Sequence, residues 1–298
     1  MLFNQYFNLK EPENGFEFFN IDVFADTKRF VDPYSIQRDT SYLGREMSKS
    51  INIFMYELLL SIRTQNYSVS RRLCSKFGET KGTRLGYSLK RIDGHGAGDK
   101  LSKDFVDSLY ASLAVTSGAV KYLEESMFVC EGIDKDIISD ITISIVKQQL
   151  ITFTQNVCRR YGIPLKSINE KISYYCNDSK KWKVNRFELP HVVDNDSGIE
   201  SYIILVPERI VPAKLTYNYR YFYSNIAIPM YKKQAIEQNL VYVFKDKNGE
   251  PKVRSGDIRN DIQFGGQKPK MSELINSNPS LLTRYRNEIA PYKYSQFD

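Results

Sequence analysis

The stretch IISDITISIVKQQLITFTQNVCRRY, residues 137–161, holds the most regular pattern in this chain of 298 residues. Its apolar residues recur at spacings of three and four, which places them on one face of a helix over several turns. Gly162-Ile163-Pro164 follows directly and is typical of a helix end. We therefore predict a long amphipathic helix over residues 137–161.

Two shorter amphipathic helices are predicted before this long helix. Apolar residues at helical spacing indicate helices at residues 48–62 and 102–116. Between them, residues 63–101 lose the helical periodicity and are rich in glycine and in charged residues. We predict a long functional loop over this stretch.

Alternation of apolar and polar residues predicts strands elsewhere in the chain. Turn-rich segments separate the later strands, and two short helices are expected near the carboxyl end, at residues 272–275 and 279–288. The predicted strands cover residues 16–23, 30–31, 85–89, 172–176, 183–189 and 202–206, with a hairpin at 241–249.

These elements predict an α+β fold with two domains. Residues 1–164 would form a mainly helical domain that carries the basic, glycine-rich loop 63–101. Residues 165–298 would form a smaller mixed domain of strands and short helices.

The composition is that of a globular protein, with 42% hydrophobic and 26% charged residues. It excludes wholesale disorder and collagen-like or mucin-like chains. No apolar run approaches the roughly 18 residues of a membrane helix, and the amino terminus lacks the pattern of an export signal. We therefore expect a cytoplasmic protein with no membrane partner.

Positive charge is concentrated in two segments of a chain whose net charge is +7. Residues 71–103 hold nine basic and three acidic side chains, and residues 159–186 hold eight and two. Such clusters indicate a surface for a polyanion, and nucleic acid is the commonest one. The alternative is a solvated basic face that keeps the protein soluble. The candidate phosphate-binding residues are Arg71, Arg72, Lys81, Arg84, Lys90 and Arg91, with a second patch of Lys180, Lys181, Lys183 and Arg186.

Aromatic residues interleave with these charges and could stack on exposed bases. They are Tyr87, Tyr174, Tyr175 and Trp182. Burial in the core is the ordinary alternative for such residues.

Four carboxylates lie within ten residues at the start of the long helix: Glu131, Asp134, Asp136 and Asp140. Asp136 and Asp140 are four apart and would share one helix face, a spacing that can hold Mg²⁺ through oxygen ligands. A metal ion there could activate water against a phosphodiester. Two structural alternatives compete, since acids are common at helix starts and could also pair with the basic loop.

Other motifs are weaker. The glycine-rich segment at residues 94–99 could contact phosphate through its backbone, and His95 within it could act as a base, but the segment lacks the P-loop pattern. The four cysteines lie far apart, and only two histidines could complete a zinc site with them. We expect reduced, buried thiols at Cys74, Cys130, Cys158 and Cys176.

Six segments, taken in order, resemble a widespread bacterial family associated with mobile elements and phage defence. They are FVDPYSI (30–36), FGETKGTRLGYS (77–88), EGIDKDIISDIT (131–142), LITFTQNVCRRYGIP (150–164), ELP with YIILVPERIV (188–190, 202–211) and NPSLLTRYRNE (278–288). Longer members of that family continue into a restriction-endonuclease-like domain. This chain has no counterpart of the segments that carry cleavage there, so the resemblance assigns it no catalytic residue and suggests the amino-terminal region of such a protein.

The residues and the resemblance together support one leading hypothesis and two alternatives. The leading hypothesis is an antiphage protein that binds nucleic acid as a sensing or targeting module. The first alternative is a metal-dependent nuclease that uses the acidic cluster. The second is an interaction subunit that recognises a phage protein or a partner nuclease subunit.

Overall fold

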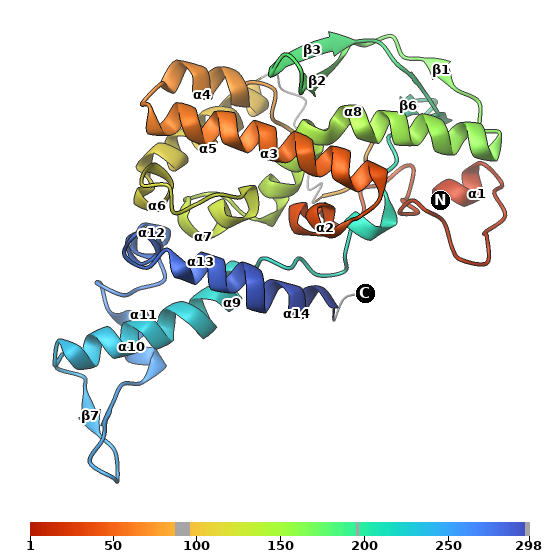
Figure 1. Ribbon diagram of the computed structural model, residues 1–298. Coiled ribbons are helices and arrows are strands. Elements are labelled where there is room, and N and C mark those ends of the chain that lie inside the picture. Colours follow the sequence, from red (N-terminus) through yellow and green to blue (C-terminus); the bar gives the residue numbers. More distant parts are fainter. Residues whose placement is uncertain (87–95, 195–196, 296–298) are drawn as a thin grey trace.

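The computed structural model describes residues 1–86, 96–194 and 197–295. The predicted α+β fold is confirmed, because the described chain is mostly helical and its strands form small two-stranded sheets (Figure 1). The long helix α8 (Lys135–Tyr161) and the helix α3 (Tyr42–Arg63) pack against each other in the upper body. The C-terminal helices lie below them.

Helix α8 confirms the predicted long helix and begins two residues earlier. The Asp134 side chain caps its amino end by accepting hydrogen bonds from the backbone N–H groups of Asp136 and Ile137. Gly162, with φ 69°, ends it in the left-handed conformation. Its middle differs from the prediction, because every residue of 141–147 is buried. The helix is therefore a central element, surrounded there by other parts of the chain.

Helix α3 extends the predicted helix at 48–62 in the amino-terminal direction. Ser41 caps it, since its hydroxyl accepts a hydrogen bond from the N–H of Gly44. The buried face includes Phe54 and Leu58. Before it, the short helix α2 (Pro33–Arg38) is capped by the buried carboxylate of Asp32.

The strands predicted at 16–23 and 30–31 are wrong. Only isolated bridges occur among these residues, such as Phe18 with Pro207. Phe18, Ile21, Val23 and Val31 are nevertheless buried. The alternation of apolar residues therefore reflects their burial in an irregular segment. The short helix α1 (Phe3–Tyr6) precedes this segment.

The loop predicted over 63–101 is also partly wrong. It contains the helix α4 (Tyr67–Cys74), which Asn66 caps and whose Leu73 and Cys74 are buried. Helix α5 (Gly96–Ala111) begins inside the predicted loop as well. Leu85 bridges Thr27, and the rest of the strand predicted at 85–89 falls on residues 87–95, outside the described residues, apart from Gly86.

The helix predicted at 102–116 is divided. Helix α5 ends at Ala111, and α6 (Leu113–Thr116) follows after Ser112. The Ser112 hydroxyl shares a hydrogen bond of 2.9 Å with Ser272 from the C-terminal helices. One 3₁₀ turn, η1 (Leu123–Glu125), and helix α7 (Ser126–Val129) then lead to α8.

In the described part of the chain, four antiparallel pairs of strands follow α8. The prediction at 172–176 is confirmed as β2 (Ile172–Cys176), which pairs with β3 (Lys181–Asn185). The strand predicted at 183–189 is split between β3 and β4, and that at 202–206 is mostly irregular. The other pairs are β1 (Lys166–Ser167) with β4 (Glu188–Leu189), β5 (His191–Val193) with β6 (Glu200–Tyr202), and β7 (Phe244–Lys245) with β8 (Pro251–Lys252).

Residues 203–206 are buried and join the amino-terminal half. The N–H of Ile204 donates to the carbonyl of Gly82, and the N–H of Phe19 donates to the carbonyl of Val206. The 3₁₀ turn η2 (Glu208–Ile210) packs against α2. The contacts of this segment thus cross the boundary predicted near residue 164.

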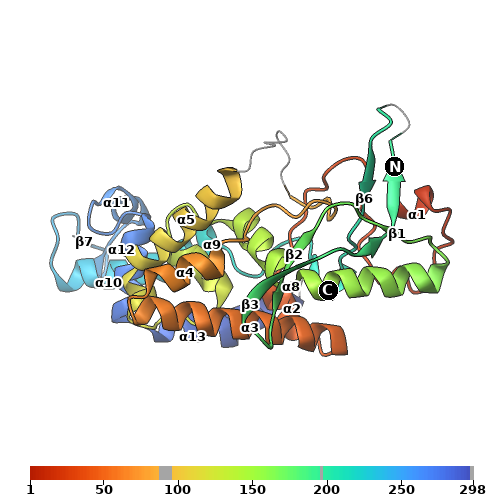
Figure 2. The same ribbon diagram turned by 90° about the horizontal axis from the view of Figure 1, so that it is seen from above.

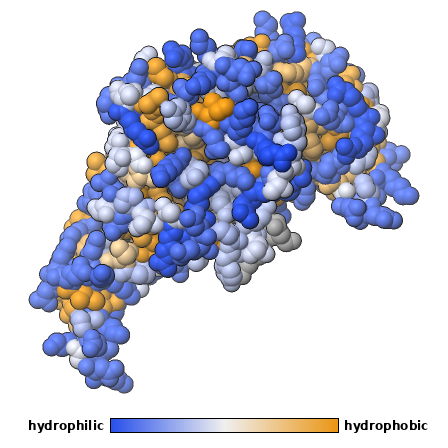
Figure 3. Space-filling view, viewed as in Figure 1, coloured by the Kyte–Doolittle hydropathy of each residue, from blue (hydrophilic) through white to orange (hydrophobic). Residues whose placement is uncertain are grey.

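Helices dominate the chain after residue 218, including a segment over 219–237 that the sequence patterns did not reveal. The hairpin β7–β8 projects from this layer as an arm (Figure 3). The helical elements are α9 (Tyr219–Phe222), the π-helical turn η3 (Tyr223–Ala227), α10 (Ile228–Glu237), α11 (Ser255–Asn260), α12 (Lys268–Ser277), α13 (Ser280–Arg284), the π-helical turn η4 (Tyr285–Ile289) and α14 (Ala290–Ser295).

No helix within residues 1–86, 96–194 and 197–295 combines the length and the apolar character that a bilayer span requires.

Replacement of Gly162 by alanine should lower the free energy of unfolding by about 1 kcal/mol, because an L-residue is strained at positive φ. The space around Gly162 is open, so strain is the only cost. Gly256→Ala in α11 is the control, since that glycine is exposed, helical and equally uncrowded. It should be neutral or stabilising by about 0.5 kcal/mol. Urea unfolding of both variants measures the contrast, and equal effects would contradict the assigned helix end.

Candidate nucleic-acid interface

The two predicted basic segments meet at Trp182. Its indole N–H donates a hydrogen bond of 2.6 Å to the carbonyl of Leu73, although the two residues are 109 positions apart. The half-buried ring packs against Phe54 and Tyr175, with ring centroids 6.3 and 5.6 Å away. Strand β3 therefore lies at the carboxyl end of α4. Figure 2 shows this hairpin alongside α8.

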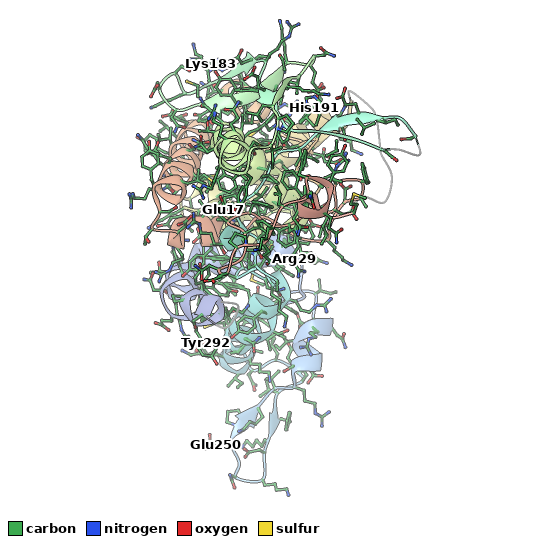
Figure 4. The ribbon with its side chains drawn as sticks, turned by 90° about the vertical axis from the view of Figure 1, so that its right-hand side faces the viewer. Glu17, Arg29, Lys183, His191, Glu250 and Tyr292 are labelled. Atoms are coloured by element: carbon green, nitrogen blue, oxygen red, sulfur yellow. The ribbon has the colours of Figure 1, made fainter. Side chains whose placement is uncertain are left out.

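This junction presents exposed cations from both segments, which we call the β3–α4 surface. Arg72 and Lys76 come from the end of α4, and the others come from β3 and the residue after it. Figure 4 shows Lys183 at the end of the molecule opposite Glu250 on the C-terminal arm. The β3–α4 surface consists of Arg72, Lys76, Lys181, Lys183 and Arg186.

Lys183 lies close to the Cys176 thiol of the same hairpin. This neighbour raises the pKa of Lys183. Hydrogen bonds from Ser179 lower the pKa of Cys176 to about 7, and Lys183 acts in the same direction. All four cysteines are buried free thiols, as the sequence predicted.

Three of the predicted phosphate-binding residues are engaged within the protein. Arg71 donates to the hydroxyl of Ser102, and Arg84 donates to the hydroxyl of Ser201. Lys180 forms an ion pair of 2.5 Å with Glu57. These contacts position α5, β6 and the β2–β3 turn, so the three side chains contribute to the fold, and their role in phosphate binding stays a prediction.

The remaining candidates of the first segment do not join the β3–α4 surface. Lys81 is exposed on the segment 78–86, which packs near Tyr202 of β6. Lys90, Arg91, Tyr87 and His95 lie outside the described residues.

Two of the predicted stacking residues, Tyr175 and Trp182, are turned toward the core. Tyr175 is 1% exposed, and the Trp182 ring faces the core. Tyr174 is half-buried and packs edge-on against Phe187. Unlike Tyr175 and Trp182, Tyr174 is paired with Lys183 across the hairpin and stays partly exposed.

The four predicted metal ligands have separate surroundings. Glu131 is exposed in a turn, and Asp134 caps α8. Asp136 and Asp140 share a face of α8, as predicted, and both lie near Glu79. Among the residues that the structure describes, no group of three or more His, Cys, Asp and Glu side chains is arranged to hold a metal ion. The Mg²⁺ site stays a hypothesis.

The half-buried Asp140 and the buried Lys147 lie on that face of α8 and influence each other electrostatically. Burial raises the pKa of Asp140 to about 8, and the neighbouring Asp136 and Glu79 act in the same direction. Burial lowers the pKa of Lys147 to about 8, against the opposing effect of Asp140. Loss of solvation, together with Asp26 and Asp136, raises the pKa of Glu79.

Glu79 and Lys147 are members of this cluster that the sequence analysis missed. The i, i+7 spacing of Asp140 and Lys147 was a usable signal, because it places both on one helix face. Glu79 gave no such signal, since it reaches α8 only through the folding of the segment 78–86. Ser144 on α8 holds that segment by donating to the carbonyl of Gly78.

One known protein family matches the part of the chain that carries the site. Residues 8–218 match the family described as a domain of unknown function, DUF8370. The chain belongs to this family. The matched DUF8370 region includes the β3–α4 surface and the acidic face of α8, and it ends just before α9. No curated protein and no solved structure matches the chain significantly.

Replacement of Asp140 by asparagine should remove a loss of stability between pH 5 and pH 8. The folded carboxyl keeps its proton up to about pH 8, whereas the unfolded one loses it near the ordinary value of 3.8. Over this range the unfolded wild type therefore binds fewer protons than the folded one. The free energy of unfolding of the wild type consequently falls as the pH rises. Lys147, whose pKa is lowered to about 8, has the opposite effect on the free energy of unfolding, but only above about pH 8.

Urea unfolding at pH 5 and pH 8 tests this, and the decline should be smaller in Asp140→Asn by on the order of 1 kcal/mol or more. Asp178→Asn, in the exposed turn after β2, is the control and should follow the wild type. The same decline in all three proteins would show that Asp140 is not the responsible group.

Proposed function

We propose that the chain is a nucleic-acid-binding module of a bacterial phage-defence system and that it binds phosphates through the β3–α4 surface. The observation that supports this most is the junction at Trp182, which joins exposed cations from two segments far apart in the sequence. The resemblance to phage-defence proteins with a nuclease domain supports a sensing or targeting role. Five of the six segments that carry the resemblance lie inside the DUF8370 region.

Binding at this surface would depend on the backbone of the nucleic acid more than on its bases. Lys181 and Arg72 can neutralise phosphates, and neutralisation releases counterions from the polymer. Tyr175 is buried and Trp182 is half-buried against it, so Tyr174 is the one described ring of the predicted set that stays partly open to a base. We therefore expect steep salt dependence and weak sequence preference.

The double variant Arg72→Glu/Lys181→Glu should weaken binding at least about tenfold at low salt and lower the salt slope by about 2. It changes one exposed cation from each segment. The control is Lys245→Glu/Lys247→Glu, which makes the same charge change on the C-terminal arm, at the opposite end of the molecule (Figure 4).

Fluorescence anisotropy with labelled duplex and single strands at about 50 and 200 mM salt measures both quantities. Equal losses in the two double variants would indicate an effect of net charge alone. An unchanged affinity in Arg72→Glu/Lys181→Glu would contradict the proposed surface.

A second candidate function is a metal-dependent nuclease, favoured by the position of Asp136 and Asp140 beside Glu79 and Lys147. Carboxylates can hold Mg²⁺, and a lysine nearby can stabilise charge on a phosphate. This function predicts cleavage that needs Mg²⁺ or Mn²⁺ and that falls at least about 100-fold in Asp136→Asn and Asp140→Asn. Denaturing gels of labelled strands measure it, and full cutting by both variants would eliminate this candidate.

A further inference from the structure

A cavity of about 500 Å³ lies between the DUF8370 region and the C-terminal helices. Lys121, Tyr122 and Glu125 line it from the turn η1 and the residues before it. Leu282 and Thr283 of α13 and Asn287 of η4 line it from the other side. A ligand in this cavity would therefore touch both parts of the chain.

Glu125 brings a buried carboxylate to the cavity. The residue is 2% exposed, and its Oε2 accepts hydrogen bonds from the backbone N–H groups of Lys121 and Tyr122, at 2.8 and 3.1 Å. Its Oε1 has no hydrogen-bond partner within the described part of the chain. One oxygen of a desolvated carboxylate is thus available to a donor.

Glu125 forms no ion pair with any residue that the structure describes. Arg286 also lines the cavity and favours the ionised form of Glu125, but its ion pair of 2.9 Å is with the buried Glu124. The Arg286 guanidinium also lies 3.3 Å above the ring centre of Tyr122. A third buried carboxylate, Asp32, accepts hydrogen bonds from neutral backbone and hydroxyl donors. Glu124 and Glu125 are therefore two buried carboxylates beside one guanidinium.

Burial raises the pKa of Glu125 to about 7, and its neighbour Glu124 acts in the same direction. Arg286 favours the ionised form of Glu125, but the effect of burial outweighs it.

We propose that this cavity binds a small organic cation, an alkyl ammonium or guanidinium compound, whose charged group pairs with Oε1 of Glu125. The cation would donate a hydrogen bond to Oε1 and place a positive charge beside the carboxylate. Leu282 and Pro279 provide an apolar wall for an alkyl chain, and the amides of Asn276 and Asn287 provide polar partners for its far end. The volume lies within the usual range of small-molecule sites.

Binding would brace the C-terminal helices against the DUF8370 region. Helices α12 and α13 lie beyond the family match, and the cavity is one of their contacts with it. A ligand that binds only the folded protein raises its stability by mass action. The proposal is independent of the β3–α4 surface and of nucleic acid.

Calorimetric titration of the full chain with agmatine and with spermidine at pH 8 and low salt tests the proposal. We expect saturable binding of one molecule per chain, and no binding of glutarate, a dicarboxylate of similar length. Absence of binding by both cations would overturn the proposal.

Three variants locate the site. Glu125→Gln keeps an oxygen for the two backbone N–H groups but removes the charge, and it should weaken binding at least tenfold. Thr283→Trp fills the cavity from an exposed position and should do the same, which keeps the test decisive if Glu125→Gln fails to fold. Glu288→Gln removes an exposed carboxylate paired with Arg284 and should bind like the wild type. Equal affinity in Thr283→Trp and the wild type would overturn the assignment.

The pH dependence provides a second readout. The groups that face Glu125 are Lys121, Tyr122 and Glu124 around η1, Asp32 from α2, Tyr217 and Arg286. Because Glu125 has its pKa near 7, affinity should rise as the pH goes from 6 to 8, by up to about tenfold per unit at the lower end. Glu125→Gln should be flat over this range, and a flat wild-type profile would overturn the role of Glu125.

Discussion

The burial of α8 on most of its sides is the constraint on which the rest of the structure depends. A helix in that position buries polar side chains as well as apolar ones, and each buried polar group requires a partner. The hydroxyl of Ser139 accepts the N–H of Val31, and that of Thr154 accepts the N–H of Leu205. Ser144 donates to the carbonyl of Gly78. Three irregular segments are thus attached to one helix.

The same constraint produces the acidic cluster. The face of α8 that holds Asp136, Asp140 and Lys147 is covered by the segment that Ser144 anchors. Removal from water moves the pKa values of Asp140 and Lys147 toward each other, to about 8 in both cases. A helix at the surface would leave these groups near their ordinary values, because water would solvate them.

The β3–α4 surface and the cavity differ in how far their charged side chains are exposed to water. At the surface, Trp182 fixes the backbone and the cations stay in water, where they cost little and can meet a polyanion. At the cavity, Glu124 and Glu125 are removed from water, and only the first of them forms an ion pair with a described residue. The first arrangement suits a large charged polymer, and the second suits one small charged group.

The sequence by itself determined the long helix, its glycine end, the β2 strand, the α+β class and the buried thiols, because these follow from local periodicity and turn chemistry. It also determined that Asp136 and Asp140 share a face. Tertiary structure alone decided that Trp182 joins the two basic segments, that Arg84 and Lys180 contribute to the fold, and that Glu79 reaches α8. The strand predicted at 16–23 was wrong, because alternation of apolar residues indicates burial and does not by itself indicate strand pairing. Contacts between residues more than a hundred positions apart leave no periodic trace in one sequence, so only the folded chain reveals them.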